Sequence, residues 1–418
     1  MRVLWLSHLV PYPPAGGVVQ RSYNLLKEAA RRHEVHLVAL DQPDIRRSGE
    51  SLETAREELA SFCDTVAVFP IPSEGSRLRW WRLVAVSFLR RRPYDVNWLR
   101  SEELRGHVTD LDRAGPAFDL VHVDTLGMAP HARCVSATPF VLNHHNVESQ
   151  MMEQRARSES HPLKRMYFQR EAGKLVRFER EVCSRASMTT VVSALDGKRL
   201  REVAGDVPVS VVEKGVDSEY FRPEMPAGHG EGGLVFVGGM SWYPNRDAML
   251  YFVRAVWPLL ESDDRSRTLT VIGQNPPEEI RALAGESRRV SAPGWVDDIR
   301  PQVDAASIYV CPIRRGGGTR LKILDALAMA KPLVATRFAV QGLKLEAGRH
   351  YLAADEPEDY VRQIRRLEED VSLRRRLASE GRALVERRYA WKVIGEHLDR
   401  AYRGAVAGAA AEGVDVRA

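Results

Sequence analysis

Hydrophobic residues along the chain occur in short runs that alternate with amphipathic stretches. Near the N-terminus, Val3–Ser7 is predicted to be a buried strand, Pro11–Gly17 a loop, Val18–Arg32 a helix and Glu34–Leu40 a second strand. This order is a βαβ unit, whose crossover connection requires parallel strands. Further strands are expected at Thr65–Phe69, Leu120–Val123, Phe140–Asn143 and Met188–Val192.

The second half of the chain repeats this pattern. A last strand and a connection are expected within residues 206–223, and a glycine-rich stretch at 227–233 precedes a second start. Strands are predicted at Leu234–Val237, Thr268–Ile272, Ile308–Pro312 and Leu333–Thr336, with a helix over Asp247–Leu260. We therefore predict an α/β protein with two Rossmann-like domains whose parallel sheets face each other across a cleft, because open sheets of this type bind ligands at the carboxyl ends of their strands.

The predicted boundaries follow from these repeats. An N-terminal domain is expected over residues 1–208 and a C-terminal domain over residues 209–388. A helix over residues 389–406 is expected to cross back to the N-terminal domain, and a flexible tail is expected at 407–418.

Composition narrows the class of protein. The chain has 418 residues, of which 44% are hydrophobic and 28% charged, values typical of a folded protein with two domains. Its net charge of +5 comes from interspersed residues and indicates an anionic small molecule or membrane surface as partner, with no nucleic acid. Four widely spaced cysteines predict free thiols in a reducing compartment and no metal site. The N-terminal apolar run is too short for a signal peptide, so a cytoplasmic protein is expected.

Arg77–Arg92 departs from the general pattern because it holds six arginines, no acidic residue and the pair Trp80 and Trp81. Its apolar middle is too short to span a bilayer. Two interpretations stay open. The segment is either an ordinary helix packed on the first sheet with solvated arginines, or a helix lying in the surface of an anionic membrane. The second would bring the protein to the inner face of the plasma membrane.

The segment from Tyr309 to Thr336 carries the strongest chemical signal. A strand ends near Pro312, the glycines at 316–318 form a loop, and a helix is expected to begin near Thr319. Glycines let a backbone approach a bulky oxyanion, and the start of a helix favours negative charge. Asp325, two turns into that helix, is placed to accept hydrogen bonds from a ribose diol. Cations suited to a diphosphate come from Arg314, Arg315, Arg320 and Lys322.

This segment, with Gly-Gly-Gly-Thr-Arg-Leu-Lys-Ile-Leu-Asp-Ala at 316–326, resembles the donor site of retaining family 4 glycosyltransferases with the GT-B fold. The likeness extends over nearly the whole chain and is nearest to the sugar transferases of bacterial exopolysaccharide and PEP-CTERM systems. Similar motifs are the Pro-Pro-Ala-Gly-Gly loop at 13–17, His-His-Asn-Val-Glu at 144–148, Lys-Gly-Val-Asp at 214–217, Tyr-Phe-Arg-Pro at 220–223, the segment 236–245 and the segment 293–300.

The resemblance implies a metal-independent hexosyltransferase that uses a nucleoside diphosphate sugar, with UDP as the family-level choice of nucleotide. The acceptor is a carbohydrate, a lipid-linked molecule or a small molecule in polysaccharide or glycoconjugate synthesis. Catalytic roles are implied for His145, Arg320 and Lys322, and acceptor binding for Asp124, Asn146 and Glu148. Donor binding is implied for Gly16, Gly17, Gly238, Gly239, Asn245, Gly294, Trp295, Val296, Arg314, Gly317, Gly318, Thr319, Leu321 and Asp325.

Two departures from the family pattern change the expected chemistry. Gly317 stands where the family has the first of two acidic residues, which removes a carboxylate from the hydroxyl groups of the donor sugar. Met240 and Asn245 replace an arginine and a lysine that many relatives carry after the first strand of the second domain. We expect Arg320 and Lys322 to supply the missing positive charge.

Two other functions stay open. One is a nucleotide-sugar epimerase, which lacks the Lys-Gly-Val-Asp connection and the glycine loop that this chain has. The other is a non-catalytic scaffold with the same fold, which the glycine at position 317 favours. Release of nucleotide from a panel of donors, measured with and without candidate acceptors, separates both from a transferase.

Overall fold

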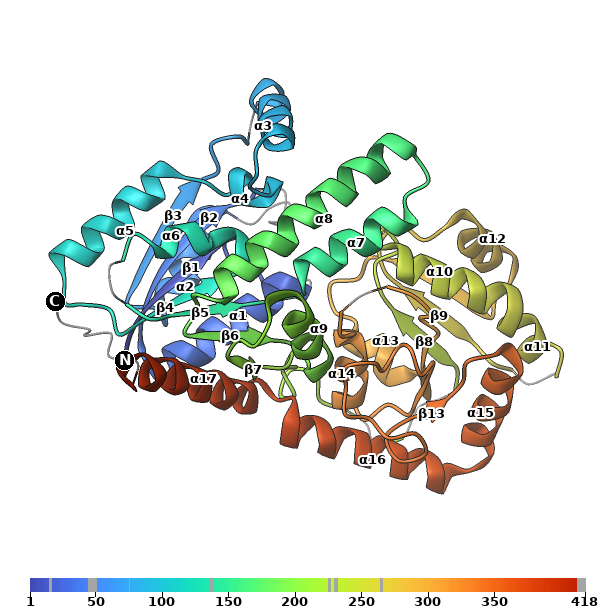
Figure 1. The fold of residues 1–418 in the computed structure, drawn as a ribbon. Coiled ribbons are helices and arrows are strands. Elements are labelled where there is room, and N and C mark those ends of the chain that lie inside the picture. The colour runs from blue at the N-terminus through green and yellow to red at the C-terminus, as the bar shows by residue number, and fades with distance from the viewer. Residues whose placement is uncertain are drawn as a thin grey trace. The chain divides into compact units, whose positions relative to one another are not determined.

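The computed structural model describes residues 1–14, 17–43, 51–74, 76–135, 138–224, 227–228, 232–263, 266–316 and 318–411. The chain divides into two compact units (Figure 1). Met1–Glu213 together with Ile394–Ala418 makes up the first unit, and Lys214–Val393 makes up the second. Each unit has its own parallel sheet with helices, as expected from the two βαβ repeats.

The first unit is built on seven strands in the order β3-β2-β1-β4-β5-β6-β7, all paired in parallel. The strand order reverses between β1 and β4, because successive strands are added outward from these two. Its elements are β1 (Arg2–Ser7), α1 (Gly17–Ala30), β2 (Glu34–Asp41), α2 (Leu52–Ala60), β3 (Thr65–Pro70), α3 (Arg77–Leu89), α4 (Tyr94–Trp98), α5 (Glu102–Ala114), β4 (Leu120–Asp124), η1 (Leu126–Met128), α6 (Ala129–Ala132), β5 (Phe140–Asn143), α7 (Glu148–Ser158), α8 (Pro162–Cys183), β6 (Met188–Val191), α9 (Ala194–Ala204) and β7 (Val209–Val211).

The last helix, α17 (Trp391–Ala411), returns to the first unit from residue 394 onward, as the sequence predicts. Among the contacts of the described residues that attach it there are three polar ones. The Tyr402 hydroxyl lies 2.9 Å from Nδ1 of buried His122, and Asp399 lies 3.1 Å from Nε2 of His33. His397 pairs with Glu213 at 3.3 Å.

The second unit has six parallel strands in the order β10-β9-β8-β11-β12-β13, which reverses between β8 and β11. Its elements are β8 (Leu234–Val237), α10 (Tyr243–Tyr251), the π-helical η2 (Phe252–Val256), α11 (Trp257–Glu261), β9 (Leu269–Ile272), α12 (Glu278–Glu286), β10 (Val290–Gly294), α13 (Arg300–Ala305), β11 (Ile308–Cys311), α14 (Leu321–Ala328), β12 (Leu333–Ala335), β13 (Leu352–Ala353), α15 (Pro357–Glu369) and α16 (Val371–Arg388).

Both faces of the second sheet are buried, because alternate residues of its central strands enter different clusters. Phe236 and Val310 belong to one hydrophobic cluster, and Val235 and Tyr309 belong to the other. This alternation places side chains on opposite faces of a parallel sheet covered by helices on both sides.

Several boundaries differ from those predicted. The first unit extends to Glu213 rather than 208, because Val209–Val211 pairs with β6 and completes the first sheet. The helix predicted at Asp247–Leu260 begins earlier, at Tyr243, and contains a π-helical segment. The last helix extends to Ala411, and residues 412–418 of the expected tail lie outside the described residues.

Candidate active site

Polar residues and glycines gather at the carboxyl ends of the strands in both units, at the two points where the strand order reverses. In the first unit these ends carry His8, after β1, and Asp124, the last residue of β4. In the second unit they carry Gly238, after β8, and the 312–320 loop, after β11. Reversal points of this kind are the usual ligand sites of open α/β sheets.

Three glycines bring the ends of neighbouring strands β8, β9 and β10 together. The Gly238 amide donates to Ile272 O, and the Gly273 amide donates to Gly294 O, both at 2.8 Å. Gly273 has φ +150°, and a Cβ there would lie only 2.1 Å from the carbonyl oxygen of Gly238. A side chain at position 273 would therefore push the β8 loop away.

Lys322, in the first turn of α14, connects two helices at the point where the strand order reverses: α14, which follows β11, and α10, which follows β8. Its Nζ donates to Asn245 Oδ1 of α10 at 2.6 Å, and the Asn245 amide donates to Gly239 O at 2.8 Å. The ammonium also lies 4.4 Å from the centre of the Phe236 ring. A Cβ on Gly238 would lie 2.2 Å from Lys322 Nζ, so this glycine makes the room that the ammonium occupies.

Burial changes the acid–base behaviour of this region. It lowers the pKa of Lys322 to about 8, although the nearby Cys311 and Asp325 raise it in part. It raises the pKa of Asp325 to about 7, against the opposing charge of Lys322. Asp325 Oδ1 is buried and has no hydrogen-bond partner in the described chain. A buried acceptor without a donor is costly, so this oxygen is suited to a hydroxyl of a bound ligand.

Arg320 holds the glycine loop. Its side chain is buried, and its guanidinium donates to the carbonyl oxygens of Gly318 and Gly316, the latter at 2.8 Å. The same group lies 4.8 Å from the centre of the Phe338 ring. Its η nitrogens thus contact the loop itself, an arrangement that makes Arg320 a positioning residue.

The loop that Arg320 holds leads to an uncapped helix. Gly316 and Gly318 have φ +105° and +76°, which favour glycine, and a Cβ on Gly316 would clash with Pro244 of α10. Helix α14 begins at Leu321, two residues after the predicted start at Thr319, and its N-cap residue, Arg320, makes no capping hydrogen bond with its side chain. The first N–H groups of a helix have no intrahelical partner, so an anion is favoured here. Gly317 lies outside the described residues.

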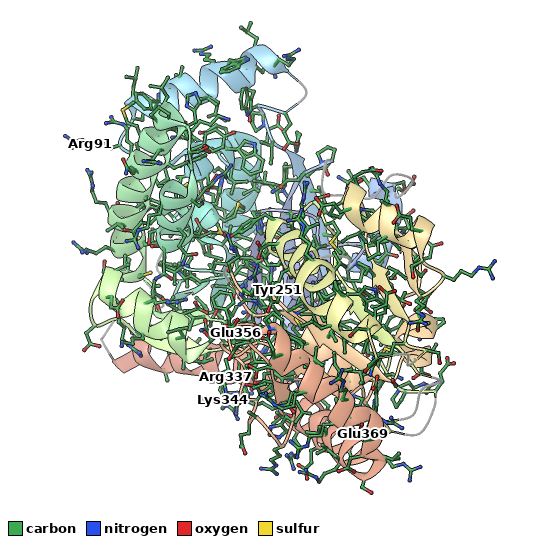
Figure 2. All side chains as sticks on the ribbon, turned by 90° about the vertical axis from the view of Figure 1, so that its right-hand side faces the viewer. Arg91, Tyr251, Arg337, Lys344, Glu356 and Glu369 are labelled. Carbon is green, nitrogen blue, oxygen red and sulfur yellow. The ribbon has the colours of Figure 1, made fainter. Side chains whose placement is uncertain are left out.

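Arg314 and Arg315 lie on the exposed side of this loop. Both guanidinium groups are 3.3 Å from Asp247 Oδ2, and Arg314 stacks 3.8 Å from the centre of the Tyr251 ring. Figure 2 labels Tyr251 close to Glu356, whose carboxylate acts on Tyr251 electrostatically. Arg314 is therefore a tethered cation at the rim of the site.

The segment predicted to hold the base follows β10. Gly294 has φ +78°, Trp295 is 48% exposed, and Val296 packs against the hydrophobic core. Because the Gly294 carbonyl accepts from Gly273, this segment is joined to the β8 and β9 ends. An exposed indole beside these glycines offers a flat surface to a nucleobase.

In the first unit, Asp124 is the centre of a buried hydrogen-bond network. Its Oδ1 accepts from Asn143 Nδ2 at 2.7 Å and lies 2.8 Å from His145 Nε2, and its Oδ2 accepts from the Ser22 hydroxyl at 2.6 Å. Arg21 donates to Asn143 Oδ1 at 3.0 Å and orients the amide. Burial opposes ionisation of Asp124, but His145 and His122 outweigh burial and hold its pKa well below the usual value.

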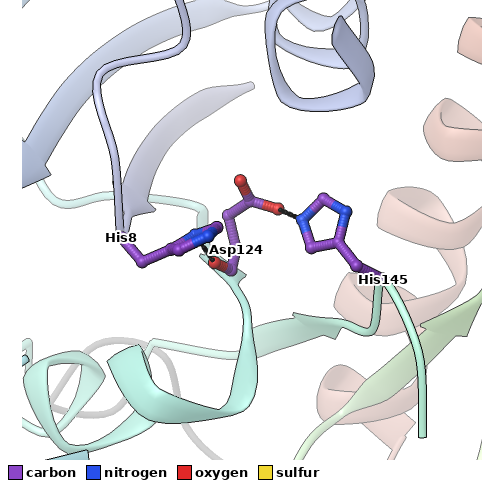
Figure 3. A group of neighbouring side chains, drawn as sticks. All are labelled: His8, Asp124 and His145. Atoms are coloured by element: carbon purple, nitrogen blue, oxygen red, sulfur yellow. Dashed lines mark hydrogen bonds and ion pairs between the residues drawn. The ribbon is translucent and has the colours of Figure 1, made fainter. Parts of the chain in front are cut away.

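These contacts change the role expected for Asp124. The side chain is fully buried and both oxygens are occupied, so it orients His145 rather than binding an acceptor directly. With Nε2 donating to the carboxylate, His145 Nδ1 is left as an acceptor, and this buried nitrogen has no partner in the described chain. Figure 3 shows the two side chains together with His8, whose Nδ1 lies 2.9 Å from the Asp124 carbonyl oxygen.

Glu148, at the start of α7, meets the residue that follows Asp124. The Thr125 hydroxyl donates to Glu148 Oε1 at 2.7 Å. Thr125 has φ +111°, a conformation that is strained for a β-branched residue and frequent at functional sites. Burial raises the pKa of Glu148 to about 8, helped by the charge of Asp95. Asn146, which lies between His145 and Glu148 in the sequence, is half-buried.

His8, Asp124 and His145 each offer one possible metal-ligand atom, and these atoms lie within 4.8 Å of one another. In the described arrangement, however, the Asp124 oxygens already accept hydrogen bonds from three side chains. A cation would have to displace some of these donors.

The sequence analysis did not single out five residues that the structure places at these strand ends or in the Asp124 network, namely His8, Arg21, Ser22, Asn143 and Gly273. The signal for His8 and Asn143 was present, because each lies at the carboxyl end of a predicted strand. Of the predicted donor residues, Gly17 begins α1, and Gly16 lies outside the described residues.

Comparison with known proteins shows which families and solved structures the chain resembles. Residues 15–220 match the family model described as Glycosyltransferase Family 4, and residues 231–370 match that described as Glycosyl transferases group 1. A sucrose-phosphate synthase from Thermosynechococcus elongatus is similar in structure, with TM-score 0.65, 17% identity, and coverage of 96% of this chain and 98% of that chain. HepE from Anabaena, in complex with UDP-glucose, has TM-score 0.60, 15% identity, and coverage of 96% and 98%.

A sequence relative is an uncharacterized 44.6 kDa protein in the cps region of Klebsiella pneumoniae. It is 18% identical over 168 residues, 38% of this chain. The match spans 43% of the relative's length.

Proposed function

Since the chain belongs to the family 4 glycosyltransferases and has the GT-B fold, we propose that it moves a sugar from a nucleoside diphosphate sugar to an acceptor hydroxyl with retention of anomeric configuration. The observation that carries this proposal is the arrangement of Lys322, Asp325 and the uncapped α14 at the reversal point of the second sheet. The structural neighbour that holds UDP-glucose has the same fold and supports the choice of UDP as nucleotide.

The donor roles follow from the chemistry of each group. The Lys322 ammonium and the free N–H groups of α14 bind the diphosphate and stabilise the negative charge that develops as the sugar leaves. The unpartnered Asp325 Oδ1 accepts from a ribose hydroxyl, and Trp295 contacts the base. Arg320 keeps the loop in shape for these contacts.

The first unit supplies contacts to substrate hydroxyls. Asp124 fixes the tautomer of His145, whose Nδ1 then accepts from a hydroxyl of the substrate. Glu148, whose pKa is raised to about 8 by burial, is protonated near neutral pH and donates as well as accepts, and Asn146 lies beside it. Because Lys322 and α14 stabilise the leaving group, the proposed transfer needs no metal ion.

Bacterial polysaccharide or glycoconjugate synthesis is the proposed setting. The sequence resemblance to exopolysaccharide transferases supports it, as does the relative from the cps region. All four cysteines are free, which fits a reducing compartment such as the cytoplasm.

A donor panel tests the transfer. UDP-, GDP- and ADP-sugars are incubated with and without glycan and lipid-linked acceptors, and nucleotide release and the anomeric proton of the product are measured. Retaining transfer predicts acceptor-dependent release and a product with the configuration of the donor. Inverted product would refute retention. Isomerised donor would identify an epimerase, and no reaction with any donor that binds would identify a scaffold.

We also propose peripheral contact with an anionic membrane through α3. Leu78, Trp81, Ala85 and Leu89 follow the spacing of one helix face, and all four are exposed, Leu78 to 80% and Leu89 to 78%. The opposite side is fixed, because buried Ser87 accepts a hydrogen bond from Asn97 of α4 at 3.1 Å. Arginines flank the exposed stripe, and Figure 2 shows Arg91 standing out from the ribbon. No helix in the described part of the chain has the length and apolarity needed to cross a bilayer.

Flotation with vesicles tests this contact. Vesicles with anionic lipid should carry the protein, and neutral vesicles should not, because an interfacial helix needs both apolar and electrostatic attraction. Substituting Leu78, Trp81 and Leu89 by serine should abolish flotation, while Leu259→Ser, at an exposed apolar position of α11, should not. Equal flotation of both variants would exclude α3 as the contact.

A further inference from the structure

A cavity of about 540 Å³ lies in the first unit at the amino ends of strands β5 and β6. Phe140, which begins β5, and Met188, which begins β6, form part of its wall. Asn143, which hydrogen-bonds to Asp124, is at the other end of β5. The sheet therefore separates this cavity from the polar network around Asp124, and the two are different sites.

The wall of this cavity is mainly apolar. Apolar side chains come from α6, from the end of α8 and from the strand starts, among them Ala132, Val135, Phe178 and Val182. Helix α17 closes one side with small residues, including Gly404 and Gly408. Gly408 is exposed at the edge of the cavity, and a Cβ there would meet no atom within 4 Å, so a larger side chain fits at this position. The volume suits an extended hydrocarbon chain.

Three arginines also form part of the wall of the cavity. Arg92 and Arg133 line it together with Arg185, and the first two also line an adjoining cavity of about 260 Å³ that contains Arg100 and Arg105. Among the described residues, the carboxylates paired with these cations are Glu102, which binds Arg100 and Arg105, and Glu181, which binds Arg133 and lies 3.9 Å from Arg185. In the described part of the chain, five arginines against two carboxylates leave an excess of three positive charges.

Arg92 is the arginine best placed to bind an anion. No carboxylate of the described residues lies within ion-pair distance of its guanidinium, and it lines both cavities. It therefore stands where the apolar space meets the adjoining arginine-lined space. An apolar channel that ends in cations is complementary to an amphiphile with an anionic headgroup.

We propose that this pair of cavities binds a lipid phosphate, with the hydrocarbon chain beside Phe178 and Gly408 and the phosphate between Arg92 and Arg133. Guanidinium groups bind phosphate oxygens with paired hydrogen bonds. Burial of the hydrocarbon chain in the apolar cavity removes it from water, which also favours binding. The site is independent of sugar transfer and does not rest on the function proposed above. A membrane lipid and a monomeric amphiphile in solution share this chemistry.

Calorimetry with full-length protein tests the proposal, using dodecyl phosphate below its micelle concentration as the probe. Saturable 1:1 binding is expected, with inorganic phosphate and dodecanol each far weaker. Arg92→Gln with Arg133→Gln should weaken binding about tenfold or more, because charge-assisted hydrogen bonds are lost. Gly408→Leu should fill the cavity. It should therefore abolish the contribution of the hydrocarbon chain to the affinity and leave the binding of inorganic phosphate unchanged.

Two controls distinguish this site from other surfaces. Trp81→Ser, on α3, should leave dodecyl phosphate binding unchanged, and nucleotide binding should be normal in Gly408→Leu. Vesicles doped with a lipid phosphate then test the membrane source, since Gly408→Leu should lower their binding only when the doped lipid is present. Undiminished dodecyl phosphate binding by Gly408→Leu, or equal binding of inorganic phosphate and dodecyl phosphate, would overturn the proposal.

Discussion

Lys322 Nζ donates to Asn245 Oδ1 at 2.6 Å and so joins α14 to α10 across the point where the second sheet reverses its strand order. The described partner is a neutral amide, which fixes the ammonium without neutralising it. The positive charge is therefore in position before a phosphate arrives. The family resemblance implies a basic residue at position 245, and in this chain the hydrogen bond to Asn245 holds the Lys322 ammonium beside that position.

The first prediction concerns this ammonium. Lys322→Met should weaken the binding of a nucleoside diphosphate by about 10- to 100-fold, the cost of a lost hydrogen bond between charged groups. Lys344→Met is the matched control, because Lys344 is an exposed lysine of the same unit. Calorimetry gives the Kd of the nucleoside diphosphate for each variant. Equal affinity in both variants would show that Lys322 does not bind the phosphate.

The second prediction is a bell-shaped dependence of nucleotide affinity on pH. Ionised Asp325, whose pKa is raised to about 7, accepts from both ribose hydroxyls, so affinity should increase as pH rises through 7. Protonated Lys322, whose pKa is lowered to about 8, binds phosphate, so affinity should decrease as pH rises through 8. Asp325→Asn should abolish the part of the increase in affinity near pH 7 that is due to the protein (the acid limb). It should keep the decrease in affinity near pH 8 (the alkaline limb). An acid limb that persists in this variant belongs to the nucleotide phosphate.

The third prediction separates orientation from donor binding in the first unit. Asp124→Asn removes the carboxylate that fixes His145, and kcat should fall about 10- to 100-fold, similar to His145→Ala, because one substrate hydrogen bond is lost. Nucleotide Kd should not change, since these residues belong to the other unit. Asp110→Asn, at an exposed position of α5, is the control. A wild-type kcat in correctly folded Asp124→Asn would show that the network is only structural.

The fourth prediction tests the glycine contact between strand ends. Gly273→Ala should destabilise the second unit by about 1–3 kcal/mol, because the new methyl group meets the Gly238 backbone. Gly285→Ala, in a helix with open space around it, should instead stabilise by about 0.5–1 kcal/mol. Urea unfolding gives both values, and a Gly273→Ala protein as stable as wild type would contradict the contact.

The fifth prediction concerns metal ions. Transfer should continue unchanged after dialysis against EDTA, because the proposed leaving-group stabilisation comes from Lys322 and α14. Activity lost on chelation and restored by a divalent cation would contradict this, and the cluster of His8, Asp124 and His145 would become the first candidate for its ligands.

The sequence predicts the central strands well, because each is a buried apolar run followed by a turn. It does not predict β10 or β13, since β10 contains Pro293 and Gly294 and β13 has only two residues. The network around Asp124 is also hidden, because Ser22 and Asp124 are 102 positions apart. From the sequence, the positive charge of Arg320 indicates a contact with phosphate. Only the fold shows that the N–H groups of its guanidinium donate to carbonyl oxygens of the glycine loop.

The central claim is that the second unit holds a nucleoside diphosphate at the reversal point of its sheet. Titration calorimetry with UDP, GDP and ADP on wild type, Lys322→Met and Asp325→Asn tests it most directly. The account predicts that at least one nucleotide binds the wild type 1:1 and that both variants bind it more weakly at pH 7.5. Binding of none of the three, or equal affinity in all three proteins, would contradict it.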